Sequence, residues 1–300
     1  MSRAHSISAR KPYGLARVCE VWHVSRSTVY DHRARAASPP AVPRRRGPVG
    51  PCTDDELLLA IRQDLEDSPF HGEGHRKVWA RLRMLQGLRT SKDRVRRLMR
   101  EHGLLAPSRV GRPQGPRTHD GTILTDRPDQ MWGTDLTSTI LVTGAVASVF
   151  VAIDHCTGEC VGIHASSRAN RFEALEPLRQ GVRERFGDFG PGVAAGLSVR
   201  HDHGSQYVSD DFQSELRFLG MESSPSFVRA PEGNGVAERF IRTLKENLLW
   251  VRHFETVEEL RQALLDFKRL HNEHWRLERL GYRTPAQARR DFAARQEQAA

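Results

Sequence analysis

Three runs of β-branched and aromatic residues follow one another between residues 131 and 166, and they constrain the fold more than any other part of the sequence. The runs are MWGTDLTSTILV, ASVFVAIDHCTG and ECVGIHA, and turn-forming residues separate them. Runs of this composition are typical of β-strands. We therefore predict three consecutive strands that pair as an antiparallel meander, with Cys156 and Cys160 on either side of the second turn.

Helical and strand patterns alternate after the meander. We predict a helix over NRFEALEPLRQGVRERFG, although Pro177 leaves its middle uncertain, a strand in GLSVRHDHGSQ, a helix in SDDFQSELRFLG, a short strand in MESSPS and a long helix from about Asn234 to Val251. Three strands followed by alternating helices and strands is the order of the ribonuclease H-like fold. The fold class is thus an α/β core over 127–252, followed by a helical C-terminal extension over 253–300. Trp132 and Trp250 are interpreted as core anchors.

Proline and glycine mark two breaks in the chain before this core. Residues 38–52 and 106–126 are rich in proline and in basic residues, so they do not suit helices and are predicted to be linkers. The breaks leave two small all-helical segments, over 1–37 and 53–105.

The segment 1–37 has a helix-turn-helix pattern. His23 and Val24 form the predicted turn, although such a turn often favours glycine because its backbone φ is positive. The second helix carries Arg26 and Arg33, which we expect to contact DNA. The apolar residues of the first helix, at helical spacing, are Leu15, Val18, Cys19 and Trp22. A plain helical hairpin is the alternative.

The segment 53–105 is predicted to form three short helices. Thr53 and Glu56 have the spacing of a capping box at the start of the first helix. The last helix begins after Ser91 and ends at Gly103. That last helix is strongly basic, and we predict that it contacts DNA through Arg94 and Arg97, in a second helix-turn-helix-like module. A solvated basic helix is the alternative.

The charge distribution supports a DNA-binding protein. Residues 1–120 hold 24 lysines and arginines against 12 acidic residues, whereas residues 121–300 hold 22 against 25. A basic arm on a near-neutral body favours binding to phosphates, because counterions are released when phosphates are neutralised; a merely solvated basic face is the alternative.

The cysteines and the lack of long apolar runs indicate the cellular compartment of the protein and whether it binds zinc. The four cysteines are too scattered for a disulfide framework, and no Cys-x-x-Cys pair follows His71 and His75, so we expect no zinc site. The chain has no secretory h-region and no run of 18 apolar residues. We expect a cytoplasmic, nucleoid-associated protein that does not enter a membrane.

Three acidic residues in the core are candidates for metal ligands. Asp135 interrupts the apolar pattern of the first strand, where an unpaired carboxylate would be costly to bury. Asp202 lies at the end of the fourth strand, before the turn at Gly204, and ligand sites of α/β folds commonly lie at strand ends. Glu238 lies one turn into the long helix, where Arg242 and Lys245 share its side. For Glu238 alone, a surface ion pair with Arg242 would explain the pattern equally well.

Three carboxylates that hold metal ions would suit an enzyme that catalyses phosphoryl transfer to DNA. Two hard cations can activate an attacking oxygen and stabilise a leaving oxygen. Carboxylate ligands favour Mg²⁺ or Mn²⁺. With two metal ions no protein nucleophile is needed, which agrees with the lack of a serine-histidine or cysteine-histidine arrangement.

The combined motifs resemble those of the transposases of the insertion sequence three family, within the retroviral-integrase-like DDE superfamily. WGTDLT, RHDHGSQY, Glu238 after 35 intervening residues, and Lys245 seven positions later carry the resemblance, together with HRKVWARLR, GNGVAERFIRTLKENLL and LGYRTPAQA. It covers residues 15–290. The resemblance implies a ribonuclease H-like core in which Asp135, Asp202 and Glu238 hold the metal ions and Lys245 contacts DNA phosphate.

The resemblance also implies the partners. A transposase binds the terminal inverted repeats of its element and target DNA, and it forms a homo-oligomer because two ends must be held together. Members of the family often work as a product joined to an upstream reading frame, which is a further possible partner.

Several residues near the triad are expected to support it. His203 flanks Asp202, Gln206 is placed to donate to Asp202 or to a phosphate, and Asn234 begins the helix of Glu238. Asp154 is interpreted as a structural, turn-capping carboxylate. Two other functions stay open: a metal-dependent nuclease or resolvase on the same fold, and a sequence-specific DNA-binding regulator with an inert core.

Overall fold

The computed structural model describes residues 4–37, 50, 52–107, 123–226 and 234–299. The chain divides into two compact units, residues 1–49 and 50–300. The predicted linkers over 38–52 and 106–126 lie largely outside the described residues.

The first unit contains two helices, α1 (Gly14–Val21) and α2 (Arg26–Ala37). His23 lies between them at a φ of 51°, so a histidine occupies the left-handed turn position that favours glycine. Cys19 is the one buried residue among the described residues of this unit, and Trp22 is 62% exposed. Arg26 and Arg33 lie on the exposed surface of α2.

The second unit begins with a module of three helices, α3 (Asp54–Asp67), α4 (His75–Leu85) and α5 (Lys92–Glu101). The predicted capping box is confirmed, because Thr53 and Glu56 exchange side-chain and backbone hydrogen bonds at the start of α3. Ser91 caps α5 by accepting from the backbone N–H of Arg94. Each helix contributes apolar residues to one small core, among them Leu57, Ile61, Val78, Val95 and Met99.

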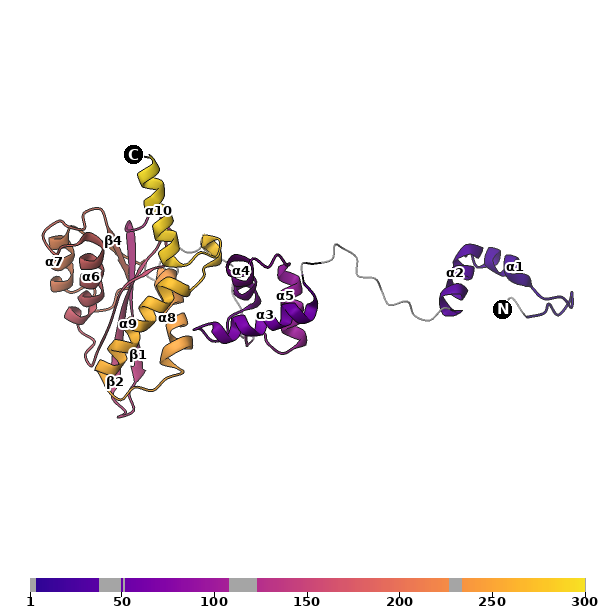
Figure 1. Ribbon diagram of the computed structural model, residues 1–300, viewed down its shortest axis with the longest axis horizontal. Coiled ribbons are helices and arrows are strands. Elements are labelled where there is room, and N and C mark those ends of the chain that lie inside the picture. The colour runs from indigo at the N-terminus through magenta and orange to yellow at the C-terminus, as the bar shows by residue number, and fades with distance from the viewer. Residues whose placement is uncertain (1–3, 38–49, 51, 108–122, 227–233, 300) are drawn as a thin grey trace. The chain divides into compact units, whose positions relative to one another are not determined.

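A five-stranded sheet in the order β3-β2-β1-β4-β5 forms the centre of this unit (Figure 1). Its strands are β1 (Met131–Ile140), β2 (Val146–Asp154), β3 (Cys160–Ser166), β4 (Ser198–His201) and β5 (Glu222–Pro225). The first three pair antiparallel, which confirms the predicted meander. β4 pairs parallel with β1, and β5 with β4.

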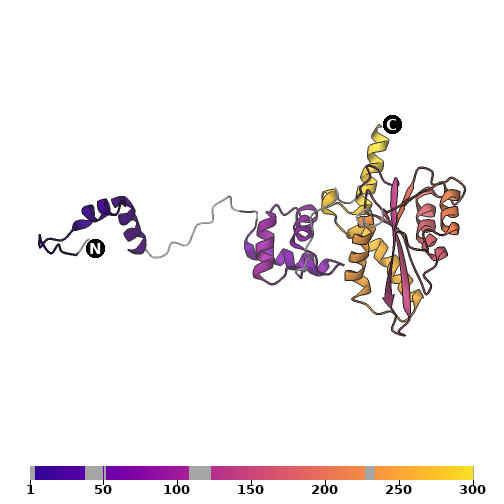
Figure 2. The same ribbon diagram turned by 180° about the vertical axis from the view of Figure 1, so that it is seen from behind.

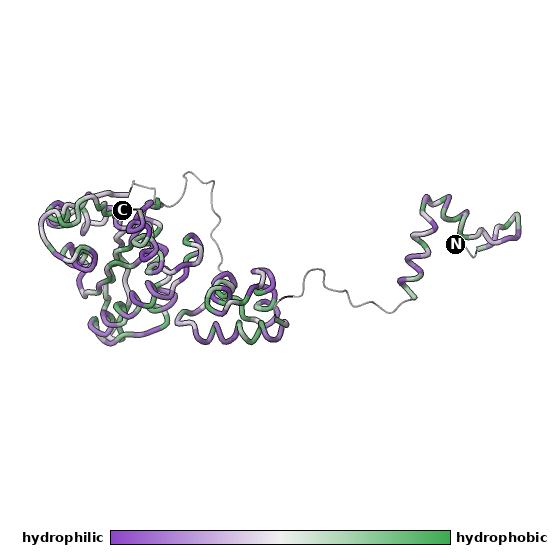
Figure 3. Tube along the Cα trace, turned by 45° about the horizontal axis from the view of Figure 1, so that its top comes forward, coloured by the Kyte–Doolittle hydropathy of each residue, from purple (hydrophilic) through white to green (hydrophobic). Residues whose placement is uncertain are grey.

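Helices cover both faces of the sheet, which gives three layers. On one face α6 (Arg171–Phe186) and α7 (Asp210–Leu219) pack on Trp132, Phe150 and Val199. On the other face α8 (Gly235–Leu244) and α9 (Val257–His274) pack on Val149 and Val151. Figures 1 and 2 show the two helical layers from opposite sides, and Figure 3 shows hydrophilic and hydrophobic residues alternating along the helices. The α/β class predicted from the sequence is confirmed.

The helix α6 runs without a break through Pro177, whose effect on the helix could not be predicted. A Cβ on Gly162 of β3 would lie 1.9 Å from the carbonyl oxygen of Pro177, and one on Gly181 would lie 2.7 Å from the Trp132 ring. The two glycines let the helix backbone lie directly on the sheet. Proline has no backbone N–H, so one hydrogen bond of the helix is lost at Pro177. The close packing of the helix on the sheet stabilises it at this point.

The long helix predicted from about Asn234 to Val251 is present, but it is not α-helical throughout. After Leu244 the backbone forms a π-helix, η2 (Lys245–Leu249), and the N–H of Trp250 donates to the Lys245 carbonyl at 2.9 Å. Trp250 follows this turn and is 67% exposed, so it is not a core anchor, whereas Trp132 is fully buried as predicted. A wide turn of this kind changes the direction of the side chains that follow it.

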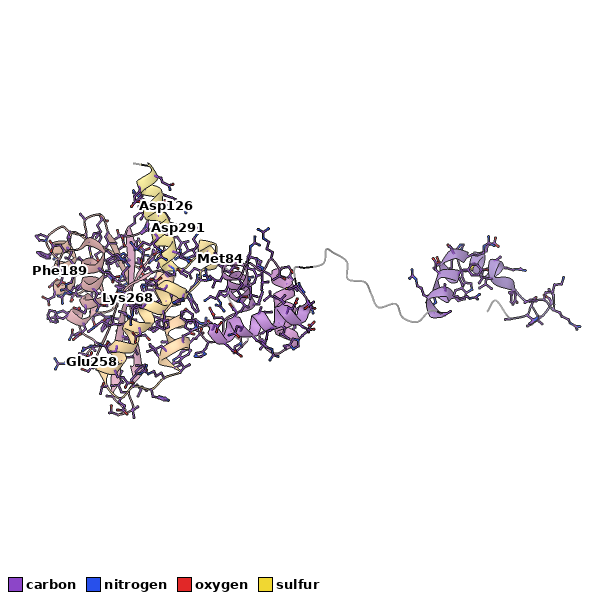
Figure 4. The ribbon with its side chains drawn as sticks, viewed as in Figure 1. Met84, Asp126, Phe189, Glu258, Lys268 and Asp291 are labelled. Atoms are coloured by element: carbon purple, nitrogen blue, oxygen red, sulfur yellow. The ribbon has the colours of Figure 1, made fainter. Side chains whose placement is uncertain are left out.

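The C-terminal residues form α9, the short 3-10 helix η3 (Glu278–Leu280) and α10 (Pro285–Ala299). Lys268 of α9, labelled in Figure 4, donates through Nζ to the Val161 carbonyl on β3 at 2.9 Å. Met84 of α4, also labelled, lies with its sulfur 3.7 Å from Nη1 of Arg276. None of the described helices is both long and apolar enough to cross a lipid bilayer.

The three-helix module contacts the core at the π-helix. The backbone N–H of His71 donates to Oδ1 of Asn247 at 2.9 Å. Phe70 belongs to the core cluster on the α8 and α9 side of the sheet, and its ring meets Trp275 edge-on at 4.8 Å. The module and the core of this unit are therefore packed together in the described residues.

Candidate active site

Asp135 lies in the middle of β1, opposite Val151 of β2, and is partly buried. Its Oδ1 accepts a hydrogen bond from the backbone N–H of Leu136 at 2.8 Å. The pKa of this carboxyl is raised to about 6: burial is the largest cause, the charges of Asp202 and Glu238 also raise it, and the Leu136 N–H and Lys245 lower it. Asp135 therefore lies within electrostatic range of both other candidate ligands.

Asp202 directly follows the last residue of β4, and the parallel pairing places it beside β1. Gly133 is in register with Arg200, and both chains continue for two residues to Asp135 and Asp202. Asp202 is exposed, and its Oδ1 accepts from the backbone N–H of Gly204 at 2.9 Å. A Cβ on Gly204 would lie 2.9 Å from that same oxygen. The glycine thus lets the loop curl around the carboxylate.

Glu238 lies in the first turn of α8 and is exposed. The apolar side of α8 packs on the sheet through Ala237, Phe240, Ile241 and Leu244. Because the helix is anchored on that side, Glu238 lies on its exposed side, within electrostatic range of Asp135. Its charge is one cause of the raised pKa of Asp135.

The charges of Asp202 and Glu238 act on Asp135, but the three carboxylates do not form a ready-made metal site. Within the described residues, no three histidine, cysteine or acidic side chains lie together so that they could hold a metal ion. The donors themselves suit a hard cation, because all are carboxylate oxygens. The pKa of Asp135 is raised mainly by burial and in part by the two neighbouring negative charges, and a divalent cation at this place would relieve that repulsion.

The basic residues predicted near Glu238 behave differently from one another. Arg242 is exposed and donates to Glu246 at 3.0 Å, one turn further along the helix. Lys245 is half-buried at the start of the π-helix, and its charge lowers the pKa of Asp135. Of these two residues, it is therefore Lys245 whose charge lowers the pKa of a candidate ligand.

The two histidines on either side of Asp202, one at the end of β4 and one in the loop after it, lie in different surroundings. His201 is buried, lies 2.6 Å through Nδ1 from the carbonyl oxygen of Asp202 and contacts Ser223 Oγ through Nε2 at 2.9 Å. Burial lowers the pKa of its imidazole. His203 is exposed, and Gln206 is half-buried with its amide folded toward Gly204. His201 thus has a structural place, while His203 and Gln206 line the open side of the loop.

The arginines predicted on the three-helix module are held within the protein. Arg94 donates to Asp54 at 2.9 Å and to the Cys52 carbonyl at 2.8 Å. Arg97 donates to Asp54 at 2.7 Å and to Glu101 at 2.8 Å. The exposed cations of α5 are Lys92, Arg96 and Arg100.

Two residues of the site were not singled out from the sequence. Thr134 and Tyr207 are both fully buried beside the candidate ligands, Thr134 directly before Asp135 and Tyr207 five positions after Asp202. Only their position next to the acidic residues could have drawn attention to them. Asn234, which was predicted as a supporting residue, is buried and donates through Nδ2 to the Thr134 carbonyl at 3.0 Å.

Asp154 has the structural role predicted for it. It is fully buried, and its Oδ1 accepts from the backbone N–H of Thr157 at 2.7 Å and from the Thr157 hydroxyl at 2.6 Å. Its Oδ2 accepts from the N–H of Asp129 at 2.9 Å. Asp154 thus caps the turn between β2 and β3 and also holds the segment before β1.

Comparison with known proteins gives matches over most of the chain. Two models described as integrase core domain match residues 125–231 and 219–285, and one described as HTH-like domain matches residues 53–112. The chain is 29% identical over 247 residues to transposase InsD for insertion element IS2A/D/F/H/I/K of Escherichia coli, which covers 80% of this chain and 81% of the relative. It is equally similar to transposase InsD for insertion element IS2-9 of Escherichia coli strain K12, with 80% and 79% covered. A solved structure of the HTLV-2 integrase catalytic core domain in complex with magnesium is 16% identical, with a TM-score of 0.41, over 55% of this chain and 98% of that one.

Proposed function

We propose that this chain, a homologue of the insertion-element transposases with an integrase core and an HTH-like domain, is a DNA transposase that cuts and joins DNA strands with divalent metal ions. The observation that carries the proposal is the cluster around Asp135. Two further carboxylates, from the loop after β4 and from α8, act on its pKa although they are far apart in the sequence. Separate core elements have no structural need to bring like charges together.

The residues proposed to hold the metal ions are Asp135, Asp202 and Glu238. Mg²⁺ or Mn²⁺, two per site, would activate the attacking oxygen and stabilise the leaving oxygen of a phosphodiester. Asp135 is fixed on the sheet, whereas Asp202 and Glu238 are exposed on a loop and on the first turn of a helix. We propose that Asp135 is the fixed ligand toward which the other two close when ions and DNA bind.

The basic residues near the carboxylate cluster are proposed to bind DNA phosphates. We propose that Lys245 contacts a phosphate at the scissile position, and its effect on the pKa of Asp135 supports this role. Arg242, paired with Glu246, is exposed one turn away and can reach a neighbouring phosphate. Cations at these positions neutralise the strand without competing for the metal.

The helical segments are proposed to bind the ends of the element. The three-helix module presents Lys92, Arg96 and Arg100 on the exposed side of α5. In the first unit Arg26 and Arg33 are exposed on α2. Helices of helix-turn-helix modules enter the major groove in this way. The proposal includes binding of terminal inverted repeats and of target DNA, and assembly into a homo-oligomer that holds two ends. It also includes cooperation with an upstream reading-frame product and action at the nucleoid.

The experiment that tests the proposal is strand transfer in vitro. The protein is incubated with Mg²⁺ and labelled duplex DNA that carries the element's ends, beside an Asp202→Asn variant and an Asp266→Asn control, which changes an exposed aspartate of α9. Joined products from the wild type and the control, and none from Asp202→Asn, are expected. Nicked DNA without joined products would indicate a nuclease, and binding without cleavage would indicate a DNA-binding regulator.

A further inference from the structure

Thr134 is a buried polar residue of β1 with contacts toward the segments that carry both other carboxylates. It directly precedes Asp135 and is fully buried. Its carbonyl oxygen accepts a hydrogen bond from Asn234, which is 100 positions further along the chain. Its hydroxyl lies close to the hydroxyl of Tyr207. Thr134 therefore has contacts toward the start of α8 and toward the loop after β4.

Asn234 does not do what an asparagine at a helix start usually does. Such a side chain normally accepts from backbone N–H groups of its own first turn. Asn234 precedes α8 but makes no such bond. Instead its Nδ2 donates to the Thr134 carbonyl at 3.0 Å, and its Oδ1 has no hydrogen-bond partner in the described part of the chain. The side chain thus connects the helix of Glu238 to the strand of Asp135.

Gly133 provides the space in which Asn234 lies. A Cβ at this position would come 2.6 Å from Asn234 Oδ1 and 2.7 Å from His155 Nε2. Any larger residue would displace the asparagine from the strand. Gly133 is itself buried between its partners on β2 and β4.

Tyr207 makes the matching contact on the other side. It is fully buried, and its ring packs edge-on against Phe212 at 5.4 Å and beside His201 at 5.6 Å. Its backbone N–H donates to the Gly204 carbonyl at 2.9 Å, which closes the loop that holds Asp202. Its hydroxyl is buried, is near that of Thr134 and lies within range of the charges of Asp135 and Asp202. The ring therefore anchors the loop against β1.

We propose that Thr134, Asn234 and Tyr207 are positioning residues, which set the distances of Glu238 and Asp202 from Asp135 and so determine how tightly the site binds divalent cations. The inference rests on the proposed function, because it assumes that the three carboxylates are the ligands. None of the three residues has to touch the metal or the DNA. Outer partners of metal ligands commonly change metal affinity by about 10- to 100-fold.

The test measures binding of Mn²⁺ to the full chain by calorimetry, without DNA. Asn234→Ala is expected to weaken Mn²⁺ binding about tenfold, and Tyr207→Phe by a smaller factor. Asn170→Ala is the matched control, because Asn170 caps its own helix α6 through backbone N–H groups and lies outside the cluster. It is expected to lower the melting temperature and to leave Mn²⁺ affinity unchanged.

The outcomes separate this inference from the function on which it rests. Loss of Mn²⁺ affinity in Asn234→Ala or in the folded Tyr207→Phe protein, with Asn170→Ala unaffected, supports it. Unchanged Mn²⁺ affinity in both variants overturns it and leaves the transposase proposal intact. A wild-type protein that binds no Mn²⁺ and cuts no DNA overturns both, and reduced DNA binding at unchanged Mn²⁺ affinity overturns the positioning role.

Discussion

Arg94 of α5 donates through Nε to Oδ1 of Asp54 at 2.9 Å, across 40 positions of sequence. Its Nη2 also donates to the carbonyl of Cys52, and the side chain is only 19% exposed. Arg94 therefore ties the last helix of the module to the start of the first helix. Arg96, two positions further, is exposed; the pKa of His75 is lowered first by burial and then by the charge of Arg96.

This difference predicts opposite effects of two neighbouring substitutions. Arg96→Ala should weaken binding to duplex DNA several-fold and reduce the salt slope of binding by about one, because one phosphate contact is lost. Arg94→Ala should lower the free energy of unfolding by about 1 kcal/mol, because a hydrogen-bonded, partly buried ion pair is broken. Fluorescence anisotropy at several salt concentrations and urea denaturation measure the two effects. Equal loss of DNA affinity in both variants, at unchanged stability, would contradict the assignment.

Gly162 allows α6 to lie directly on β3, so its replacement should be severe. In Gly162→Ala the new Cβ would lie 1.9 Å from the Pro177 carbonyl oxygen, which belongs to the backbone and cannot rotate away. We expect a loss of at least about 3 kcal/mol in the free energy of unfolding, measured by urea denaturation. Gly190→Ala is the control, since its added Cβ meets nothing within 4 Å and should change stability little. Similar stabilities of the two variants would show that the helix can shift.

Much of this fold could be predicted from the sequence because the signals are local. The continuous apolar run of β2, the capping box at Thr53 and the serine caps at Ser91 and Ser209 all depend on residues within a few positions of each other. The candidate ligand Asp202 could be placed for the same reason, since it directly follows a strand.

Contacts between distant residues could not be predicted in this way. The partner of Asn234 is a backbone carbonyl 100 positions earlier, and the partner of Arg94 is an aspartate 40 positions earlier. Neither pairing has a local pattern. The wide turn at Lys245 likewise lies within a sequence of good helix formers, beside a contact from His71 to Asn247 that only the folded chain provides.

The C-terminal helix should depend on one arginine more than on its neighbour. Arg289 of α10 donates to Asp129 at 2.5 and 3.0 Å and also pairs with Glu159, which is buried. Arg289→Ala leaves these carboxylates without that cation, so we expect a loss of about 3 kcal/mol in the free energy of unfolding. Arg290→Ala, which breaks only an exposed pair at 3.9 Å with Glu273, should cost less than about 0.5 kcal/mol. Limited proteolysis and thermal denaturation compare them, and equal effects would show that α10 is held by its apolar contacts instead.

Asp135 is the residue for which function and stability should conflict. Its pKa is raised from 3.8 to about 6, so the folded protein binds this proton more tightly than the unfolded chain does. Stability is therefore unaffected by this group below about pH 4 and falls as the pH rises through 6. One pKa unit corresponds to about 1.4 kcal/mol, so at neutral pH the ionised carboxylate costs the metal-free fold roughly 2–3 kcal/mol.

Replacing that carboxylate should consequently stabilise the metal-free protein while abolishing its activity. Asp135→Asn is expected to melt at a higher temperature than the wild type at pH 7, with the difference vanishing near pH 4. Added Mg²⁺ should raise the melting temperature of the wild type, because a ligand that binds only the folded state stabilises it, and should leave the variant unchanged. Differential scanning calorimetry at pH 4, 5.5 and 7, with and without Mg²⁺, measures both. A variant less stable than the wild type at pH 7 would mean that the charge of Asp135 is already compensated in the metal-free fold, and the carboxylate cluster would then have no electrostatic reason to recruit a cation.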